Sequence, residues 1–114
     1  MSDFLNIAKE AAKAALDKKA ENVAILKMDD VTIITDFFVI CTAMNRTQAQ
    51  AIANNVEDAM KEKGMKILHR EGLSEGTWVL LDYGCIVVHV FQDEMRHFYD
   101  LETLWGDATV IKMD

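Results

Sequence analysis

Several residue patterns that would point to a known chemistry are missing from this sequence. It contains no proline and only two cysteines, and these form no CxxC pair. A zinc or thioredoxin-like site therefore has no support. Cys41 and Cys85 lie in apolar, strand-like runs, so we expect them to be small, buried hydrophobic residues. The five glycines stand singly at positions typical of caps and turns, so no glycine-rich loop is present to hold phosphate.

A positive net charge is also absent. The chain carries 12 lysines and arginines against 19 aspartates and glutamates, which gives a formal net charge of -7. Because an acidic chain repels phosphate backbones, we expect little direct contact with nucleic acid. A basic partner would instead be attracted, whatever its identity.

Long hydrophobic runs are lacking as well. The most apolar stretch, residues 31–44, contains Asp36 and is too short to cross a bilayer. The opening residues, Met1-Ser2-Asp3, do not have the basic and then apolar order of a signal peptide. We therefore expect a cytoplasmic protein, in a reducing compartment, without a membrane partner.

Hydrophobic periodicity predicts a single α/β domain. The expected elements are, in chain order, a helix at 3–19, strands at 22–28 and 37–42, a helix from Asn45 to Gly64, strands at 65–71, 77–82 and 85–91, and a helix from Asp93 to Gly106. The order α-β-β-α-β-β-β-α implies one mixed sheet of about five strands flanked by helices. We assign residues 1–107 to this domain and 108–114 to a loose C-terminal tail.

The helix ends carry capping signals. Ser2 or Asp3 can cap the first helix, and Asp93 can cap the last. Asn45 can cap the middle helix, with Gln48 reaching back to it as in a capping box. The apolar residues of the last helix are Met95, Phe98, Leu101, Leu104 and Trp105.

The last two strands predict a hairpin whose loop is residues 83–84. In that register Asp82 opposes Cys85, and Trp78 opposes His89. Since side chains alternate along a strand, the hairpin has two distinct faces. One face is wholly apolar and should point into the core, with Val79, Leu81, Ile86, Val88 and Val90. The other face is mixed, with Trp78, Leu80, Asp82, Cys85, Val87, His89 and Phe91.

The mixed face of the hairpin has two interpretations. It could be a second core layer with Asp82 and His89 at its rim. It could equally be an exposed recognition patch in which Trp78 is the binding anchor, since tryptophan is common at such positions. Alternation alone does not report exposure, so both interpretations stay open.

Catalytic and metal-ligating groupings are weak. The three histidines belong to no HExxH motif or close His/Cys cluster, so a metal role has little support. Cys85 and His89 are four residues apart on one strand, too far for direct contact. The pair Asp29-Asp30 is better explained as a turn than as a cation site.

Three motifs occur in order along the chain. The first is ITDFFVICT at 34–42, the second is WVLLDYG at 78–84, and the third is VVHVF at 87–91 with RHFYDLETLW at 96–105. Together they resemble the ribosomal silencing factor family, also called Iojap or RsfS. The resemblance covers about residues 5–107, nearly the whole chain.

The family resemblance implies a function. Family members bind the large ribosomal subunit through large-subunit ribosomal protein uL-fourteen, which lies on the intersubunit face. Occupancy would block joining of the small subunit and lower translation. The implied fold is nucleotidyltransferase-like, but the Gly-Ser pair and Asp-x-Asp of a working nucleotidyltransferase are absent, and Asp29-Asp30 has the wrong spacing. The resemblance therefore implies a translational repressor without enzyme activity, metal or cofactor.

The resemblance also implies where the partner binds. Carried over position by position, the contact region is Glu71, Trp78, Leu80, Asp82, Tyr83 and Gly84. Cys85 stands where the family commonly has an acidic residue, and Phe37 stands where an aromatic hydroxyl is more usual. The alternatives are a nucleotidyltransferase-like enzyme and an adaptor that binds a different protein partner. A symmetric homodimer through the same apolar patch would compete with docking.

Overall fold

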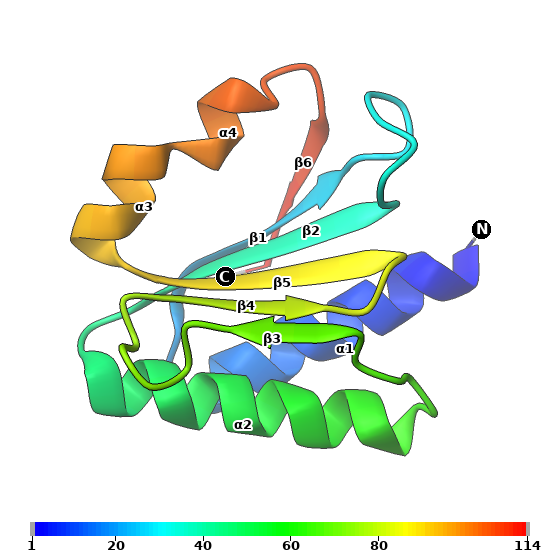
Figure 1. The fold of residues 1–114 in the computed structure, drawn as a ribbon. Helices are drawn as coiled ribbons and strands as arrows, with labels where there is room; N and C mark the ends of the chain where they lie inside the picture. Colours follow the sequence, from blue (N-terminus) through cyan, green and yellow to red (C-terminus); the bar gives the residue numbers. More distant parts are fainter. Residues whose placement is uncertain (1, 114) are drawn as a thin grey trace.

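A mixed β-sheet forms the middle layer of the structure, with helices on both faces (Figure 1). The computed structural model describes residues 2–113 except for the side chains of Ser2 and Asp3, so the caps expected there lie outside the described residues. The strands are β1 (Glu21–Lys27), β2 (Phe37–Ala43), β3 (His69–Glu71), β4 (Trp78–Asp82), β5 (Ile86–Gln92) and β6 (Thr109–Lys112). The helices are α1 (Ser2–Asp17), α2 (Arg46–Glu62), α3 (Asp93–Tyr99) and α4 (Leu101–Leu104). The predicted α/β class is confirmed, with six strands in place of about five.

Strands β2 and β5 lie at the centre of the sheet. The strand order is β3-β4-β5-β2-β1-β6, and among these neighbours only β2 and β5 pair in parallel. Six of the seven residues of β2 are buried, which confirms the prediction of a strand covered on both sides. The two edge strands, β3 and β6, are short, as is common for exposed sheet edges.

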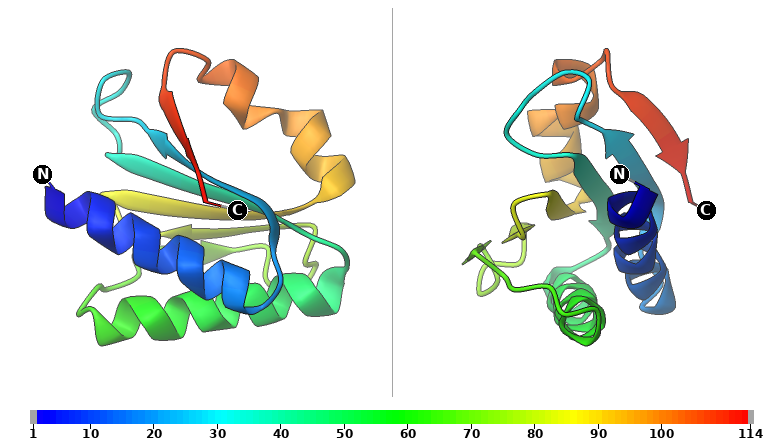
Figure 2. Two further views of the ribbon diagram at one scale, coloured as in Figure 1. Left: turned by 180° about the vertical axis from the view of Figure 1, so that it is seen from behind. Right: turned by 90° about the vertical axis from the view of Figure 1, so that its right-hand side faces the viewer.

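The two faces of the sheet carry different layers (Figures 1 and 2). Helices α1 and α2 lie side by side on one face, and α3 and α4 lie on the other. The larger core lies under α1 and α2. From residue 4 onward every buried residue of α1 is an alanine, so this helix can approach the sheet closely. The smaller core includes Leu26, Ile40 and Phe91, and Leu101 and Trp105 of the α4 region pack against it.

The C-terminal segment differs from the prediction. The expectation of a loose tail at 108–114 is wrong for Thr109–Lys112, which form β6 and pair antiparallel with β1. In this pairing Ile111 lies opposite Ile25. Ile111 is the only one of the four residues of β6 that is even partly buried, so the segment carries too weak a pattern to be recognised in the sequence.

The expected last helix, 93–106, is broken. Asp100 separates α3 from α4 with a left-handed backbone of φ 47° and ψ 55°, a conformation that cannot continue a helix. The predicted cap at Asp93 is also wrong, because the N-cap position is Gln92. The Gln92 side chain does not cap the helix but donates to the carbonyl of Gly76 at 2.8 Å.

The start of α2 keeps half of its predicted capping box. Asn45 Oδ1 accepts a hydrogen bond from the backbone N–H of Gln48 at 2.8 Å. The reciprocal half is wrong, because Gln48 Oε1 accepts from Met44 N at 2.6 Å. Gln48 Nε2 donates to the two carbonyls of residues 18–19, each at 3.0 Å. One side chain thereby joins the end of α1 to the start of α2.

Replacing Gln48 by alanine should lower the free energy of unfolding by about 1–2 kcal/mol, because several hydrogen bonds between the helices are lost at once. Urea denaturation measures this change. Asn54→Ala, on the exposed face of α2, is the matched control and should change stability by less than about 0.5 kcal/mol. Equal losses in the two variants would contradict the linking role of Gln48.

Candidate functional site

The hairpin of β4 and β5 keeps its predicted faces but not its predicted register. Trp78 lies opposite Phe91 and Leu80 lies opposite His89, so the pairing is displaced by two residues from the prediction. Because side-chain direction repeats every second residue, an even displacement leaves the paired residues on the faces predicted for them.

The turn of the hairpin explains the displacement. Tyr83 N donates to Ile86 O at 2.8 Å, so the loop consists of Gly84 and Cys85. Gly84 has a φ of 85°, in the left-handed region, and glycine is favoured at the first position of such two-residue loops. Asp82 Oδ1 accepts from Gly84 N at 2.8 Å and holds this conformation. A loop moved by one residue moves the pairing by two.

The apolar face of the hairpin is confirmed as part of the larger core. Its buried residues are Val79, Leu81, Ile86, Val88 and Val90. Cys85, which was assigned to the mixed face, lies in the turn and packs against this larger core while only half-buried. Cys41 is fully buried as predicted, and burial raises the pKa of its thiol to about 12.

The mixed face is divided between the interior and the surface. On β5, His89 and Phe91 are buried, with 4% and 1% of their surfaces exposed. On β4, Trp78, Leu80 and Asp82 are half-buried. The expected position of His89 at a rim is wrong, because α3 packs over β5. On β5 this face therefore belongs to a second core layer, as the first interpretation expects, whereas β4 reaches the surface.

A concavity with a volume of about 610 Å³ lies over the exposed part of the mixed face. It is formed by β3, β4 and the loop between them, and we call it the hairpin concavity. Its lining residues are His69, Glu71, Gly72, Glu75, Trp78, Leu80 and Asp82. Glu71, Trp78, Leu80 and Asp82, four of the residues expected in the contact region, thus line one surface.

Tyr83 and Gly84, the other two expected contact residues, do not line the hairpin concavity. The Tyr83 side chain is buried in the larger core on the opposite face, and burial raises the pKa of its hydroxyl to about 12. Gly84 lies in the turn, where an added Cβ would approach Leu68 Cδ1 to 3.3 Å. Both residues form the end of the hairpin and take no part in lining the concavity.

The hairpin concavity is acidic. Glu71 and Glu75 are exposed and Asp82 is half-buried, so three carboxylates surround its apolar part. The basic residue of β3, Arg70, is directed elsewhere, since its guanidinium donates to both carboxylate oxygens of Glu57 on α2, at 2.6 and 3.1 Å. Trp78 and Leu80 therefore lie within a negative rim that would attract a cationic group.

Trp78 is held in place by three neighbouring rings. Its indole Nε1–H donates to His89 Nδ1 at 3.1 Å. Its ring stacks on Phe91 with centroids 5.0 Å apart, and Tyr99 of α3 lies 4.5 Å away on the same measure. Neither the hydrogen bond nor the Tyr99 contact could be read from the sequence, because both join residues of different elements.

His89 is neutral because of these contacts and its burial. Since Nδ1 accepts the hydrogen bond from Trp78, the ring proton must be on Nε2. Nε2 is buried without a hydrogen-bond partner. Burial lowers the pKa of His89 to about 4. A charged imidazole would lose its acceptor atom, so the Trp78 contact depends on the neutral form.

Other polar groups have structural explanations. Asp29 and Asp30 form the predicted turn, where Lys27 Nζ contacts their carboxylates at 2.9 and 3.2 Å. Among the described side chains, those of residues 4–113, no group of three or more histidine, cysteine, aspartate or glutamate residues is arranged to hold a metal ion. No helix in that part of the chain has the length and apolar character needed to span a bilayer.

Comparison with known proteins gives consistent relatives. The family model described as "Ribosomal silencing factor during starvation" matches residues 2–114. The ribosomal silencing factor RsfS of Bacillus subtilis is 42% identical over 109 residues, which cover 96% of this chain and 92% of the relative. The chloroplastic protein Iojap of Arabidopsis thaliana is 35% identical over 112 residues, which cover 98% of this chain and 47% of the relative.

Two solved structures share the fold. A crystal structure of a protein from Chromobacterium violaceum has a TM-score of 0.88 and 36% identity, covering 90% of this chain and 86% of that chain. A crystal structure from Bacillus halodurans has a TM-score of 0.81 and 37% identity, covering 99% of this chain and all of that chain.

The buried imidazole of His89 makes the free energy of unfolding depend on pH. The pKa of His89 is about 4 in the folded protein and 6.5 when unperturbed, so the unfolded state binds more protons between these values. Stability should therefore fall as pH drops from about 6.5 to 4, by an amount approaching roughly 3 kcal/mol for this group. Urea denaturation across that range should show a weaker pH dependence in His89→Gln. His69→Gln, at an exposed position, should keep the wild-type slope, and identical slopes in all three proteins would contradict the assignment.

Proposed function

The chain belongs to the ribosomal silencing factor family, and we propose that it represses translation by binding the large ribosomal subunit through protein uL-fourteen. The bound protein occupies space on the intersubunit face that the small subunit needs, so the two subunits do not join. Occupancy of the intersubunit face is enough to prevent subunit joining, and no catalytic step or cofactor takes part. Its site of action is the cytoplasm.

The hairpin concavity is the observation that carries this proposal. Trp78 is a half-buried aromatic residue, fixed from below by His89 and Phe91, and open to the concavity. A fixed aromatic anchor loses little conformational freedom on binding, so more of its contact energy appears as affinity. Anchors of this kind dominate the energetics of many protein interfaces.

The charge of the concavity supports a basic partner. Glu71, Glu75 and Asp82 surround the anchor, and the whole chain has a formal net charge of -7. Complementary charge speeds the encounter of two proteins and disfavours partners of the wrong sign. A basic protein surface on the ribosome meets both requirements, whereas exposed ribosomal RNA would be repelled.

An adaptor for another protein would use the same concavity, and competition distinguishes it from the proposed function. If the proposed function holds, isolated uL-fourteen should bind this protein directly. Added large subunits should then compete with the isolated uL-fourteen for the same binding surface. A homodimer formed through the concavity would weaken binding at high protein concentration, so titrations belong at concentrations where the monomer prevails.

Trp78→Ala should weaken binding to isolated large subunits by about 2 kcal/mol or more, which is roughly 30-fold, because the anchor is lost. Co-sedimentation at several protein concentrations measures the affinity. Leu80→Ala, which truncates a smaller residue of the same surface, should give a smaller loss in the same direction.

Ile33→Ala is the control for these truncations. Ile33 is fully exposed in the loop between β1 and β2, and it does not line the hairpin concavity. This variant should bind as the wild type does. If Trp78→Ala and Leu80→Ala stay folded by circular dichroism and bind with unchanged affinity, the concavity is not the docking site.

Reversing the charge of the rim should slow association. In the double variant Glu71→Lys with Glu75→Lys, the association rate with large subunits should fall by about tenfold at low salt, and its dependence on salt should weaken. Stopped-flow fluorescence with labelled subunits measures the rate.

The matched control for charge reversal is Asp58→Lys with Glu62→Lys. Both residues are exposed on α2, on the opposite side of the sheet, and the net charge changes by the same amount. This control should slow association less than the rim variant does. Equal slowing would mean that only total charge matters and that the rim has no special part.

A further inference from the structure

Helix α3 lies next to Trp78 of the hairpin concavity and leads into α4, and only partly buried apolar side chains of the two helices, Met95 and Leu101, pack against the smaller core. Both helices are described in full, and neither contains a buried residue. They have seven and four residues, far too few to be stable as isolated helices. Their position therefore depends on this limited apolar packing and, in addition, on polar contacts with the rest of the protein.

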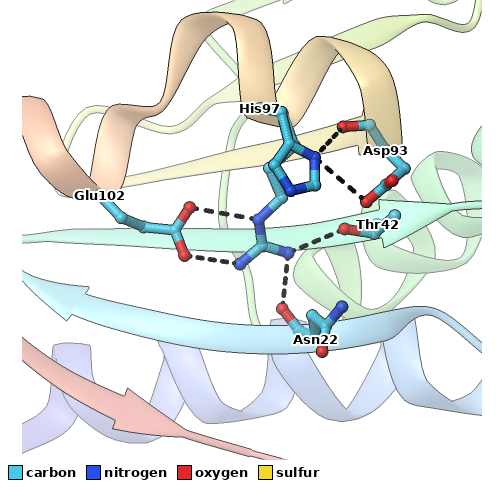
Figure 3. Close-up of polar contacts among 6 residues, drawn as sticks. Asn22, Thr42, Asp93, His97 and Glu102 are labelled. Atoms are coloured by element: carbon cyan, nitrogen blue, oxygen red, sulfur yellow. Dashed lines mark hydrogen bonds and ion pairs between the residues drawn. The ribbon is translucent and has the colours of Figure 1, made fainter.

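Arg96 supplies those contacts from the middle of α3. Its Nη1 donates to the carbonyl of Asn22 on β1 at 2.7 Å and to Thr42 Oγ1 on β2 at 2.9 Å. Its Nε and Nη2 donate to the two carboxylate oxygens of Glu102 on α4, at 3.2 and 2.8 Å. Figure 3 draws these contacts, which join two strands to both helices. The Arg96 side chain is only 11% exposed, whereas that of its partner Glu102 is 37% exposed.

An irregularity in β1 makes one of these contacts available. Asn22 has a φ of 51°, and the pairing of β1 with β2 shifts register between Glu21 and Ala24. Such a bulge takes a backbone carbonyl out of the regular ladder. The Asn22 carbonyl accepts from Arg96 instead, so the strand irregularity and the guanidinium together fix where α3 lies.

Fixing α3 places two aromatic side chains next to the anchor of the concavity. Tyr99 lies against Trp78, with ring centroids 4.5 Å apart, and Phe98 lies against Tyr99, with centroids 5.0 Å apart. Phe98 is 77% exposed. The three rings form a continuous row that leads from the half-buried Trp78 outward to a phenylalanine in solvent.

Helix α3 also carries exposed carboxylates. Asp93, Glu94 and Asp100 are exposed on or beside α3. Arg96 adds little free positive charge because Glu102 pairs with it. Helix α3 therefore adds apolar surface next to the concavity, whereas Asp93 and Asp100 line a separate pocket together with Asn22 and Lys112.

We propose that α3 is a second wall of the docking surface, with Phe98 as an additional anchor and Arg96 as the residue that positions it. The occupant is the basic protein surface of the large ribosomal subunit that also fills the hairpin concavity. This inference rests on the proposed function. It adds Phe98 and Tyr99 to the docking surface, with Arg96 as their positioning residue. None of these three belongs to the contact region expected from the sequence.

Phe98→Ala tests the anchor without disturbing the fold, because the side chain is mostly in solvent. Affinity for large subunits should fall by roughly tenfold. Ile33→Ala, which removes a fully exposed apolar side chain elsewhere, should leave affinity unchanged. Unchanged affinity in Phe98→Ala, or an equal loss in both variants, would overturn the second wall.

Trp78→Ala, measured in parallel, separates the two proposals. If Trp78→Ala loses binding and Phe98→Ala does not, the result would support the proposed function and contradict only the role of α3 as a second wall. If the wild-type protein fails to bind large subunits at low salt, the result would contradict both the proposed function and the role of α3 as a second wall.

A double-mutant cycle tests whether Arg96 acts by positioning Phe98. Arg96→Lys keeps the charge but cannot form the paired contact with Glu102. It should weaken binding several-fold when Phe98 is present and by less than about twofold when Phe98 is already alanine. A general loss of stability would reduce binding equally in both backgrounds. Equal reductions would therefore overturn the positioning role.

Discussion

The hydrogen bond from the Trp78 indole to the buried imidazole of His89 connects the interior of this protein with its surface. It holds only while His89 is neutral, and burial keeps the imidazole neutral by lowering its pKa to about 4. The arrangement leaves His89 Nε2 without a partner, a cost that the surrounding aromatic packing must offset. In return, Trp78 has one orientation toward the hairpin concavity. A polar contact in the smaller core thus fixes in advance the side chain that we propose as the binding anchor.

The helices cover the two faces of the sheet unequally, and this determines which part of the sheet is open to a partner near Trp78. Helices α1 and α2 cover one face completely enough for the larger core, whereas the short α3 and α4 cover only part of the other face. On that face β5 is buried and β4 is half-exposed. A single hairpin thus supplies both core residues and the lining of the concavity. The Arg96 contacts set the boundary between the two, since they determine how far α3 extends over the sheet.

Much of this could be predicted from the sequence, for identifiable reasons. The two faces of the hairpin survived an error of two residues in register, because strand side chains repeat with that period. The buried strand β2 and the Asn45 cap were also predictable, since each depends on a local pattern. The break at Asp100, strand β6 and the inward direction of Tyr83 were not. These features depend on contacts between distant segments, as when Arg96 reaches Asn22 across 74 residues of chain.

The central claim is that the protein docks with the side of the sheet that carries β3, β4 and α3. Hydrogen–deuterium exchange of the protein, free and bound to large ribosomal subunits, tests this claim most directly. Exchange should become slower on binding in residues 69–82 and 93–99, with little change on the exposed side of α2. Protection confined to α1 and α2, with unchanged exchange in β3 and β4, would contradict it.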